Sequence, residues 1–332
     1  MRNSKILGMG FYVPDKIVTN DDLAKLMETS DQWIRERTGI EQRRYAAEGQ
    51  GSADMGKEAA VKALADAGLQ TKDLDLLVFA TLSPDYTFPG SACVMQSLMD
   101  FPEIAAIDIR AQCSGFIYSV AVADQFIKTG MYNRVMVVGA ETHSTGIEFA
   151  TRGRDVTVLF GDGAGAVILG PCDDPRQGFL SHHLHANGKH FDKLWLECPA
   201  SKFMPRITHE MIDQGRVWPK MDGKFIFRHA IEGMSAVIQE ALQANHLTVA
   251  DIDLLVPHQA NLRINQMVSK KLGLPEDKVF NNIMKYGNTT AATIPIVLCE
   301  ARAAGKIKPG NLVCLAAFGS GLTWAASLIR WA

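Results

Sequence analysis

An internal repeat constrains the fold of this chain more than any other feature of its sequence. Residues 60–78 recur as residues 238–256, an offset of 178, with eight identities in the nineteen aligned positions. In each copy a segment with helical spacing is followed by a turn and a short apolar run of strand length. Because one supersecondary unit is present twice, we expect two similar halves.

The repeat continues beyond this segment. A helix expected over 114–129 and ended by Gly130 matches one over 289–304 ended by Gly305, and a strand over 134–139 matches one over 311–316. Alternating strands and helices predict an α/β protein whose two units pack around a pseudo-twofold axis. We place the halves at 1–170 and 171–332. Residues 171–230 are polar, rich in Pro and Gly and fit the repeat poorly, so we predict an irregular excursion there.

The composition bounds the class of protein. The chain has 332 residues and a net charge of −2, which argues against a general nucleic-acid binder. No apolar run reaches the length of a membrane span, and the first residues are too polar for a secretory signal. Six cysteines in a chain of this length do not resemble a disulfide framework. We therefore expect a cytoplasmic protein with reduced thiols and no membrane association.

Cys113 is the first candidate for chemistry. It stands between an expected strand at 105–109 and the expected helix at 114–129. The N–H groups and the dipole at a helix start stabilise a thiolate, so Cys113 is a candidate nucleophile. A buried core cysteine is the alternative, and this stretch alone leaves both open.

His258 and Asn288 are its candidate partners. His258 ends the strand at 253–257, the repeat of the strand at 75–81, so it should lie near the shared axis; the alternative is a histidine bonded to backbone at a loop start. At an offset of 175, Cys113 falls on Asn288, which we place at the start of the matching helix, where it would also serve as an N-cap. A cysteine, a histidine and an asparagine converging from two halves indicate acyl transfer through a thioester.

Five motifs together resemble the β-ketoacyl-acyl-carrier-protein (ACP) synthase III family. They are QCSG at 112–115, FGDGAG at 160–165, PHQANLRI at 257–264, YGNTTAATIP at 286–295 and AFGSGLTW at 317–324. The resemblance covers essentially the whole chain. It implies the thiolase fold, a duplicated αβαβα layered architecture, and a homodimer.

The resemblance also implies a mechanism without a cofactor. Cys113 would attack an acyl-CoA thioester, and malonyl-ACP would follow once CoA has left. His258 and Asn288 would donate hydrogen bonds to the malonyl thioester oxygen, so that loss of CO2 leaves a stabilised enolate. The backbone N–H groups of Cys113 and Ser320 would stabilise the oxyanion of the acylation step. Glycine is usual in the family where this chain has Ser320, so we expect a slightly altered pocket.

Ligand positions of the family carry over to this chain. Trp33 and Arg154 resemble the pair that sandwiches the adenine of CoA, with Arg152 as a competitor, and Arg37 resembles a phosphate contact. The pantetheine tunnel would be lined by Gly223, Phe227 and Asn261. Phe318 would line the acyl pocket, and Phe88 would enter the acyl pocket of the partner subunit.

Docking of the acidic carrier protein is the weakest of these assignments. The candidate docking charges are Arg263, Arg228, Lys270 and Lys271. Solvated surface charges, and a surface aromatic at Trp33, are the alternatives for these groups.

Two other signals carry no site. The G-x-G-x-x-A spacing at 161–166 follows a strand, but another strand rather than a helix is expected after it, so we interpret these glycines as packing positions between the halves. Histidines 182, 183, 185 and 190, with cysteines 172 and 198, match no usual zinc spacing, and we expect no metal.

Two alternative functions remain open. A condensing enzyme of secondary metabolism, of the alkyl-quinolone type, would use malonyl-CoA or malonyl-ACP. The separation of 145 positions from Cys113 to His258 is long for the housekeeping family and keeps this alternative open, whereas the NTTAAT run at 288–293 favours the housekeeping enzyme. A non-catalytic acyl-CoA-binding protein with the same fold is the other alternative. The acyl chain length is not set by the sequence.

Overall fold

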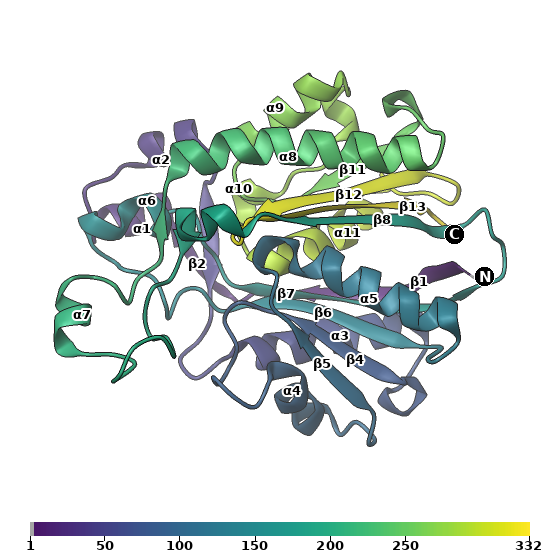
Figure 1. Cartoon of the computed structure of the whole chain (residues 1–332), viewed down its shortest axis with the longest axis horizontal. Coiled ribbons are helices and arrows are strands. Elements are labelled where there is room, and N and C mark those ends of the chain that lie inside the picture. The colour runs from purple at the N-terminus through teal and green to yellow at the C-terminus, as the bar shows by residue number, and fades with distance from the viewer. Residues whose placement is uncertain (1–2) are drawn as a thin grey trace.

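The computed structural model describes residues 3–332 and shows five layers, helices–sheet–helices–sheet–helices (Figure 1). The first sheet has the order β1-β7-β6-β4-β5, and the second has the order β11-β12-β13-β8. In the first sheet the strands are β1 (Asn3–Tyr12), β7 (Gly163–Cys172), β6 (Val135–Glu141), β4 (Leu76–Ala80) and β5 (Ala105–Ile109). In the second they are β11 (Leu254–Pro257), β12 (Leu312–Gly319), β13 (Thr323–Arg330) and β8 (Gly178–Ala186). The predicted layered α/β architecture is confirmed.

Three pairs of helices cover the sheets. The outer face of the first sheet carries α3 (Ser52–Ala67) and α4 (Ser91–Met99), and that of the second carries α8 (Gly223–Ala244) and α9 (Leu262–Leu272) (Figure 1). Between the sheets lie α5 (Gly115–Thr129) and α11 (Thr293–Ala303). Phe116 and Val120 of α5 and Ile294 and Val297 of α11 belong to one buried core cluster with strand residues of both sheets. The two halves therefore share the central core.

The repeat keeps its offset of 178 in the paired strands β4–β6 and β11–β12. Leu76 pairs with Val135 in the first sheet, and Leu254 pairs with Val313 in the second. The Asp75 N–H donates to the Arg134 carbonyl at 2.9 Å, and the Asp253 N–H donates to the Leu312 carbonyl at 3.0 Å. Equivalent pairs of residues thus occupy equivalent positions in the two halves.

This register corrects the expected symmetry mate of Cys113. Short 3-10 turns over Gln112–Ser114 and Thr290–Ala292 precede α5 and α11, and each begins with a left-handed residue, Gln112 with φ 45° and Thr290 with φ 48°. The counterpart of Cys113 is therefore Ala291, and the predicted equivalence with Asn288 is wrong. Asn288 precedes the turn, where it forms an isolated parallel bridge with Phe160. The error came from starting the second helix at 289 instead of Thr293.

The predicted excursion at 171–230 is also too long. Its first part is β8, a regular strand paired with β13, and its last part begins α8. The irregular segment runs over 187–222 and carries only short elements, β9 (Leu194–Trp195), α7 (His209–Asp213) and β10 (Lys220–Met221). The sequence of β8 did not indicate a strand because its outward side chains are polar. His183 and His185 face outward and reach Glu240 of α8 at 3.0 and 2.6 Å.

A small cap closes one end of the molecule. It contains β2 (Lys16–Thr19), β3 (Gln42–Tyr45), α1 (Asn20–Ala24), α2 (Asp31–Thr38), α6 (Arg154–Thr157) and α10 (Ile283–Tyr286). Arg43 is fully buried in it and donates to the side-chain oxygen of Asn20 and to the Val158 carbonyl, both at 2.9 Å. The cap carries Trp33 on α2 toward the second half.

The glycines at 161–166 pack between the halves. A Cβ on Gly161 would lie 2.2 Å from the Tyr286 carbonyl oxygen, and one on Gly165 would lie 2.6 Å from the Cβ of Pro295. Strand β7 begins at Gly163, inside the motif, and continues to Cys172, so the expectation of a strand rather than a helix is confirmed. The strand expected before the motif is wrong, because helix α6 and an isolated bridge at Phe160 precede it. The packing interpretation of this motif is confirmed.

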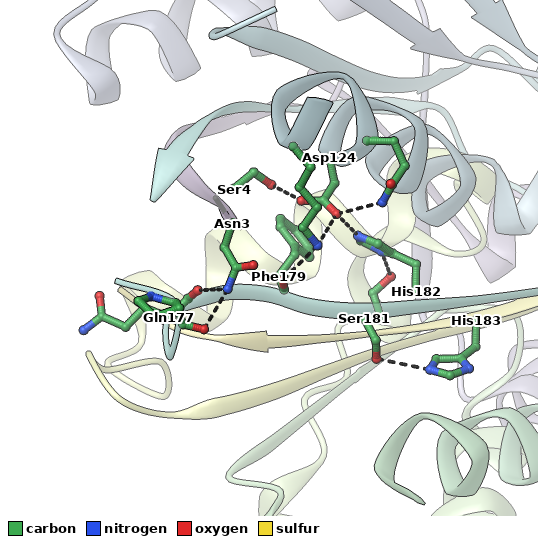
Figure 2. Close-up of polar contacts among 12 residues, drawn as sticks. Asn3, Ser4, Asp124, Gln177, Phe179, Ser181, His182 and His183 are labelled. Atoms are coloured by element: carbon green, nitrogen blue, oxygen red, sulfur yellow. Dashed lines mark hydrogen bonds and ion pairs between the residues drawn. The ribbon is translucent and has the colours of Figure 1, made fainter. Parts of the chain in front are cut away.

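A buried polar network joins the halves at the other end (Figure 2). The carboxylate of Asp124 on α5 accepts from the Ser4 hydroxyl at 2.7 Å, from Lys128 at 2.7 Å and from His182 Nε2 at 3.1 Å. The other ring nitrogen of His182 lies 2.7 Å from the Ser327 hydroxyl. Among residues 3–332 no group of three or more His, Cys, Asp or Glu side chains is arranged to hold a metal ion. No helix in that range is long and apolar enough to cross a membrane.

Candidate active site

A mostly apolar cavity opens between α8, α9 and the ends of the central strands. Its inner end is formed by Cys113, His258, Asn288, Phe318 and Gly319. Its outer part includes Gly223, Phe227 and Asn261, the predicted tunnel residues. The structure thus brings the three candidate catalytic residues and the tunnel residues to one cavity.

Cys113 is held as a buried thiol. Its side chain is 6% exposed, and burial raises its pKa to about 12, with the nearby Glu141 carboxylate adding to the rise. The backbone N–H groups of Ser320 and Cys113 and the Thr290 hydroxyl donate toward the sulfur and oppose this effect. Cys113 therefore rests as a thiol, because loss of hydration outweighs the stabilisation of a thiolate by the donors at the helix start.

Gly319 makes room for the sulfur. A Cβ at this position would lie 2.7 Å from Cys113 Sγ. The following residue, Ser320, turns its hydroxyl away to donate to the Leu194 carbonyl. The serine thus keeps its backbone N–H toward Cys113 while its side chain fixes another wall of the cavity, since Leu194 also lines it.

The hydrogen bonds around His258 favour one tautomer in the free protein. Its Nδ1 lies 2.7 Å from the Thr293 hydroxyl oxygen, and that hydroxyl donates to the Thr290 carbonyl at 2.9 Å. A hydroxyl has one proton, so the Thr293 oxygen accepts and His258 Nδ1 carries the hydrogen. His258 Nε2 is then a free acceptor, and it has no hydrogen-bond partner among residues 3–332. Burial lowers the pKa of His258 to about 3, so the ring is neutral.

Asn288 uses its side-chain oxygen locally and keeps its side-chain NH2 group for a ligand. The predicted N-cap role is wrong, because Thr289 is the N-cap of the 3-10 turn and Ala292 is that of α11. The Asn288 side-chain oxygen accepts from the Thr290 N–H at 2.9 Å and so stabilises the 3-10 turn before α11. Its backbone is fixed to the first half, because its N–H donates to the Leu159 carbonyl at 2.8 Å. The side-chain NH2 group is the part of Asn288 that remains to meet a ligand.

The mouth of the cavity carries aromatic and basic groups. The guanidinium carbons of Arg37 and Arg154 lie 4.3 and 4.6 Å from the Trp33 ring centroid. Arg152 instead pairs with Glu148 at 2.6 Å, which agrees with the preference for Arg154. Asn261 connects this group to the tunnel by donating to the Arg37 carbonyl at 2.8 Å.

The remaining predicted residues lie outside the cavity. Arg263 lies over the Phe227 ring at 5.6 Å and is exposed on α9, as are Lys270 and Lys271 at the helix end, whereas Arg228 is exposed on α8. Phe88 is 82% exposed in the loop after β4 and does not line the cavity of its own chain.

Comparison with known proteins decides the family. Residues 107–188 match 3-oxoacyl-ACP synthase III, and residues 242–331 match the C-terminal part of the same family. The β-ketoacyl-ACP synthase III of Caldanaerobacter subterraneus is 45% identical, with 98% of this chain and 97% of that protein covered. The chain belongs to the β-ketoacyl-ACP synthase III family.

Other members of the family agree. The synthase III of Paramagnetospirillum magneticum is also 45% identical, over 98% of both chains. The crystal structure of 3-oxoacyl-ACP synthase III from Aquifex aeolicus superposes with a TM-score of 0.91 at 40% identity, covering 99% of this chain and 100% of that one. The predicted family, its thiolase-like fold and its acyltransferase class are confirmed.

Four residues of this synthase III site were missed at the sequence level: Glu141, His143, Thr290 and Thr293. The two threonines lie inside the YGNTTAATIP motif at 286–295 and contact Cys113 or His258. Glu141 ends β6, and Gly319 ends the equivalent β12 at the repeat offset of 178. Extending the strand repeat by a few residues would therefore have placed 141–143 at the shared axis opposite the loop that holds Ser320.

Proposed function

We propose that this chain condenses an acyl-CoA primer with malonyl-ACP to give a β-ketoacyl-ACP, CoA and CO2, and so initiates fatty-acid chains without a cofactor. The observation that carries the proposal is the meeting of Cys113, His258 and Asn288 at the inner end of one apolar cavity. The thiol supplies a nucleophile, the imidazole a proton acceptor and the amide a hydrogen-bond donor.

Acyl transfer begins from the buried thiol. His258 Nε2, which is free and unprotonated, accepts the Cys113 proton as the sulfur attacks the thioester carbonyl. The N–H groups of Cys113 and Ser320 face the sulfur and stabilise the oxyanion that forms beside it. When the tetrahedral intermediate collapses, the carbon–sulfur bond to CoA breaks and the CoA thiolate takes the proton back from His258.

Condensation requires the other tautomer of His258. The Asn288 amide donates to the malonyl thioester oxygen, whereas His258 Nε2 donates only if it carries a hydrogen. The Thr293 hydroxyl permits this exchange, because it can turn from the Thr290 carbonyl and donate to His258 Nδ1. Loss of CO2 then leaves an enolate held by two donors, and its carbon attacks the acyl carbon on Cys113. The carbon–sulfur bond breaks, and the released Cys113 thiolate takes a proton from solvent to restore the thiol.

The cavity mouth supports binding of a CoA thioester. Trp33 offers an aromatic face for adenine, and Arg37 and Arg154 supply positive charge for phosphates. Because Arg154 lies on the Trp33 ring in the free protein, we expect it to move onto the adenine when CoA binds. The exposed Arg263 beside the tunnel residue Phe227 is the proposed anchor for the carrier protein, with Arg228, Lys270 and Lys271 around it.

A homodimer completes the proposal. β5 pairs with β4 and with no other strand among the described residues, so one edge of the first sheet is open for a second copy. Phe88 and Tyr86, in the loop after β4, are 82% and 63% exposed, and a partner subunit would cover them. All six cysteines are free, which suits the reducing cytoplasm where we place the protein.

Labelling tests the reaction. Radiolabelled acyl-CoA should label the protein, and peptide mapping should place the label on Cys113. The Cys113→Ser variant should lose the label, and the Cys93→Ser variant, at an exposed thiol, should keep it. A label that persists in Cys113→Ser would reject the proposed nucleophile.

A substrate panel tests the pathway. Acyl-CoA primers of increasing length are supplied with malonyl-ACP or with malonyl-CoA, and CO2 release and product are measured. Condensation with malonyl-ACP supports initiation of fatty-acid chains. Condensation with malonyl-CoA alone would assign the chain to secondary metabolism, and CoA binding without CO2 release would make it a binding protein.

A further inference from the structure

A second buried imidazole lies near Cys113. His143 follows β6, its side chain is almost fully buried, and its Nε2 lies 2.7 Å from the Thr290 hydroxyl oxygen. Its position is fixed from two sides, because its backbone N–H donates to the Asp162 carboxylate at 2.7 Å and its ring centroid lies 4.4 Å from that of Phe160. His143 takes no part in the acyl transfer and condensation steps proposed for Cys113, His258 and Asn288.

The Thr290 hydroxyl connects His143 to the nucleophile. Thr290 is fully buried in the turn Thr290–Ala292, which packs on the turn that contains Cys113. Hydrogen bonding by the Thr290 hydroxyl lowers the pKa of the Cys113 thiol, that is, it favours the thiolate. When the thiolate forms, the hydroxyl hydrogen turns toward the sulfur, and the hydroxyl oxygen is left to accept from the ring N–H of His143, 2.7 Å away. The three groups then form a directed chain, His143 Nε2–H to Thr290 Oγ1–H to Cys113 Sγ.

We propose that His143 and Thr290 are positioning residues whose hydrogen-bond chain stabilises the Cys113 thiolate. This inference rests on the proposed acyl-transfer function. The thiolate occurs twice in that cycle. It first forms when His258 accepts the thiol proton. It forms again as the leaving group, when the enolate carbon attacks the acyl carbon and the electron pair of the carbon–sulfur bond returns to Sγ. The chain donates hydrogen bonds at both moments and transfers no proton.

Burial keeps the His143 end of the hydrogen-bond chain uncharged. Loss of hydration, together with the nearby His258, lowers the pKa of His143 to about 3. The ring therefore remains uncharged through the neutral range and donates as a dipole. Glu141 has the opposite effect on Cys113, because its negative charge disfavours the thiolate. Burial raises the pKa of Glu141 to about 7. A donor chain that offsets this carboxylate allows Cys113 to react without a permanent positive charge beside it.

The test follows the thiol itself. The rate of alkylation of Cys113 by iodoacetamide is measured from pH 6 to pH 10 on the isolated peptide by mass spectrometry, because Cys93 is exposed and also reacts. Thr290→Val keeps the shape and removes the hydroxyl, and Thr290→Ser keeps the hydroxyl. We expect Thr290→Val to slow alkylation at pH 8 about tenfold and to move the pH profile upward by about one unit, the size of one hydrogen bond to an anion.

The matched variants distinguish loss of a hydrogen bond from loss of side-chain packing. Thr290→Ser should remain within about twofold of the natural protein, since the donor is retained. His143→Leu should slow alkylation by about threefold, and His143→Gln, whose side-chain N–H can replace Nε2–H, should restore it. Melting temperatures of all four variants report on folding.

The proposal is overturned if Thr290→Val leaves the pH profile unchanged, or if Thr290→Ser falls as far as Thr290→Val. Should Thr290→Val fail to fold, an unchanged profile in His143→Leu overturns it equally. Alkylation needs no acyl substrate. A failure of the proposed hydrogen-bond chain is therefore distinguishable from a failure of the condensing activity.

Discussion

Single hydrogen atoms decide what the site residues can do. His258 Nδ1 and Thr293 Oγ1 are 2.7 Å apart, and the Thr293 hydroxyl already donates to a carbonyl, which leaves His258 Nε2 as an acceptor. The residue types Cys, His and Asn were recognised in the sequence together with their shared motifs. Their protonation states were not, because the pKa of a thiol or an imidazole depends on the hydration it loses when distant segments close around it.

Removal of the Thr293 hydroxyl should slow the acylation of Cys113. Thr293→Val leaves His258 Nδ1 without a partner, so we expect Cys113 acylation by acyl-CoA to slow about tenfold, while Thr293→Ser remains within about twofold. Single-turnover labelling with radiolabelled acyl-CoA measures this step, and CO2 release from malonyl-ACP measures the other. Equal rates for the Val and Ser variants would show that the hydroxyl does not set the tautomer.

Acid should destabilise the protein through its buried histidines. His143 and His258 have folded-state pKa values of about 3, against about 6.5 for an unfolded histidine. The unfolded chain therefore binds protons first, and stability falls as the pH drops from about 6.5 toward 3, by up to about 1.4 kcal/mol per pH unit for each ring. Glu141 acts oppositely, since its raised pKa costs stability as the pH rises from about 4.5 to 7.

The prediction is tested by how steeply the free energy of unfolding changes with pH. Urea unfolding of His143→Leu between pH 6 and pH 4.5 should give a flatter slope than that of the natural protein, because one proton-binding group of the unfolded chain is gone. His246→Leu is the matched control, since His246 lies in an exposed turn. A slope in His143→Leu as steep as in the control would contradict the assignment.

At the scale of elements, strand ends and turns deliver the site residues. Cys113 and Ala291 occupy equivalent turns before α5 and α11, whereas Asn288 approaches from the preceding segment through its bridge to Phe160. The strands expected at 75–81, 105–109, 134–139 and 311–316 correspond to β4, β5, β6 and β12. The start of α11 and the extent of the excursion were misjudged. Apolar periodicity does not distinguish a 3-10 turn from a first helical turn, and β8 owes its polar side to Glu240 of α8.

The β7–α11 contact should respond to one added side chain. Gly165→Val would place its Cβ 2.6 Å from the Cβ of Pro295, so we expect a loss of about 1–3 kcal/mol in the free energy of unfolding. Gly188→Ala is the control, because no atom lies within 4 Å of its added Cβ. Urea denaturation of both variants measures the difference, and a Gly165→Val midpoint equal to that of Gly188→Ala would contradict the contact.

At the scale of the molecule, the active cavity belongs to neither half alone. Cys113 comes from the first half and His258 and Asn288 from the second, and α5 and α11 pack in one shared core. The network of Asp124 with His182 and Lys128 joins the halves at the opposite end (Figure 2). The site therefore exists only while the two halves are packed together.

The proposed dimer makes Phe88 the test at this scale. Phe88→Glu should weaken self-association and change the preferred acyl-CoA length, because a charge would be buried in the partner's pocket. Met131→Glu is the control, since Met131 is 64% exposed at the opposite end of the first sheet. Light scattering after gel filtration gives the mass, and a Phe88→Glu variant that stays dimeric with an unchanged acyl-CoA panel would reject the role.

The sequence by itself determined the duplication, the layered α/β class and the family, because these depend on local periodicity and on contiguous motifs such as PHQANLRI at 257–264. Only the tertiary structure decided that Ala291 is the symmetry mate of Cys113, that the resting nucleophile is a thiol, and that His143 reaches it through Thr290. These properties depend on register, burial and hydrogen-bond direction between segments more than a hundred residues apart, and such relations are formed only when the two halves pack.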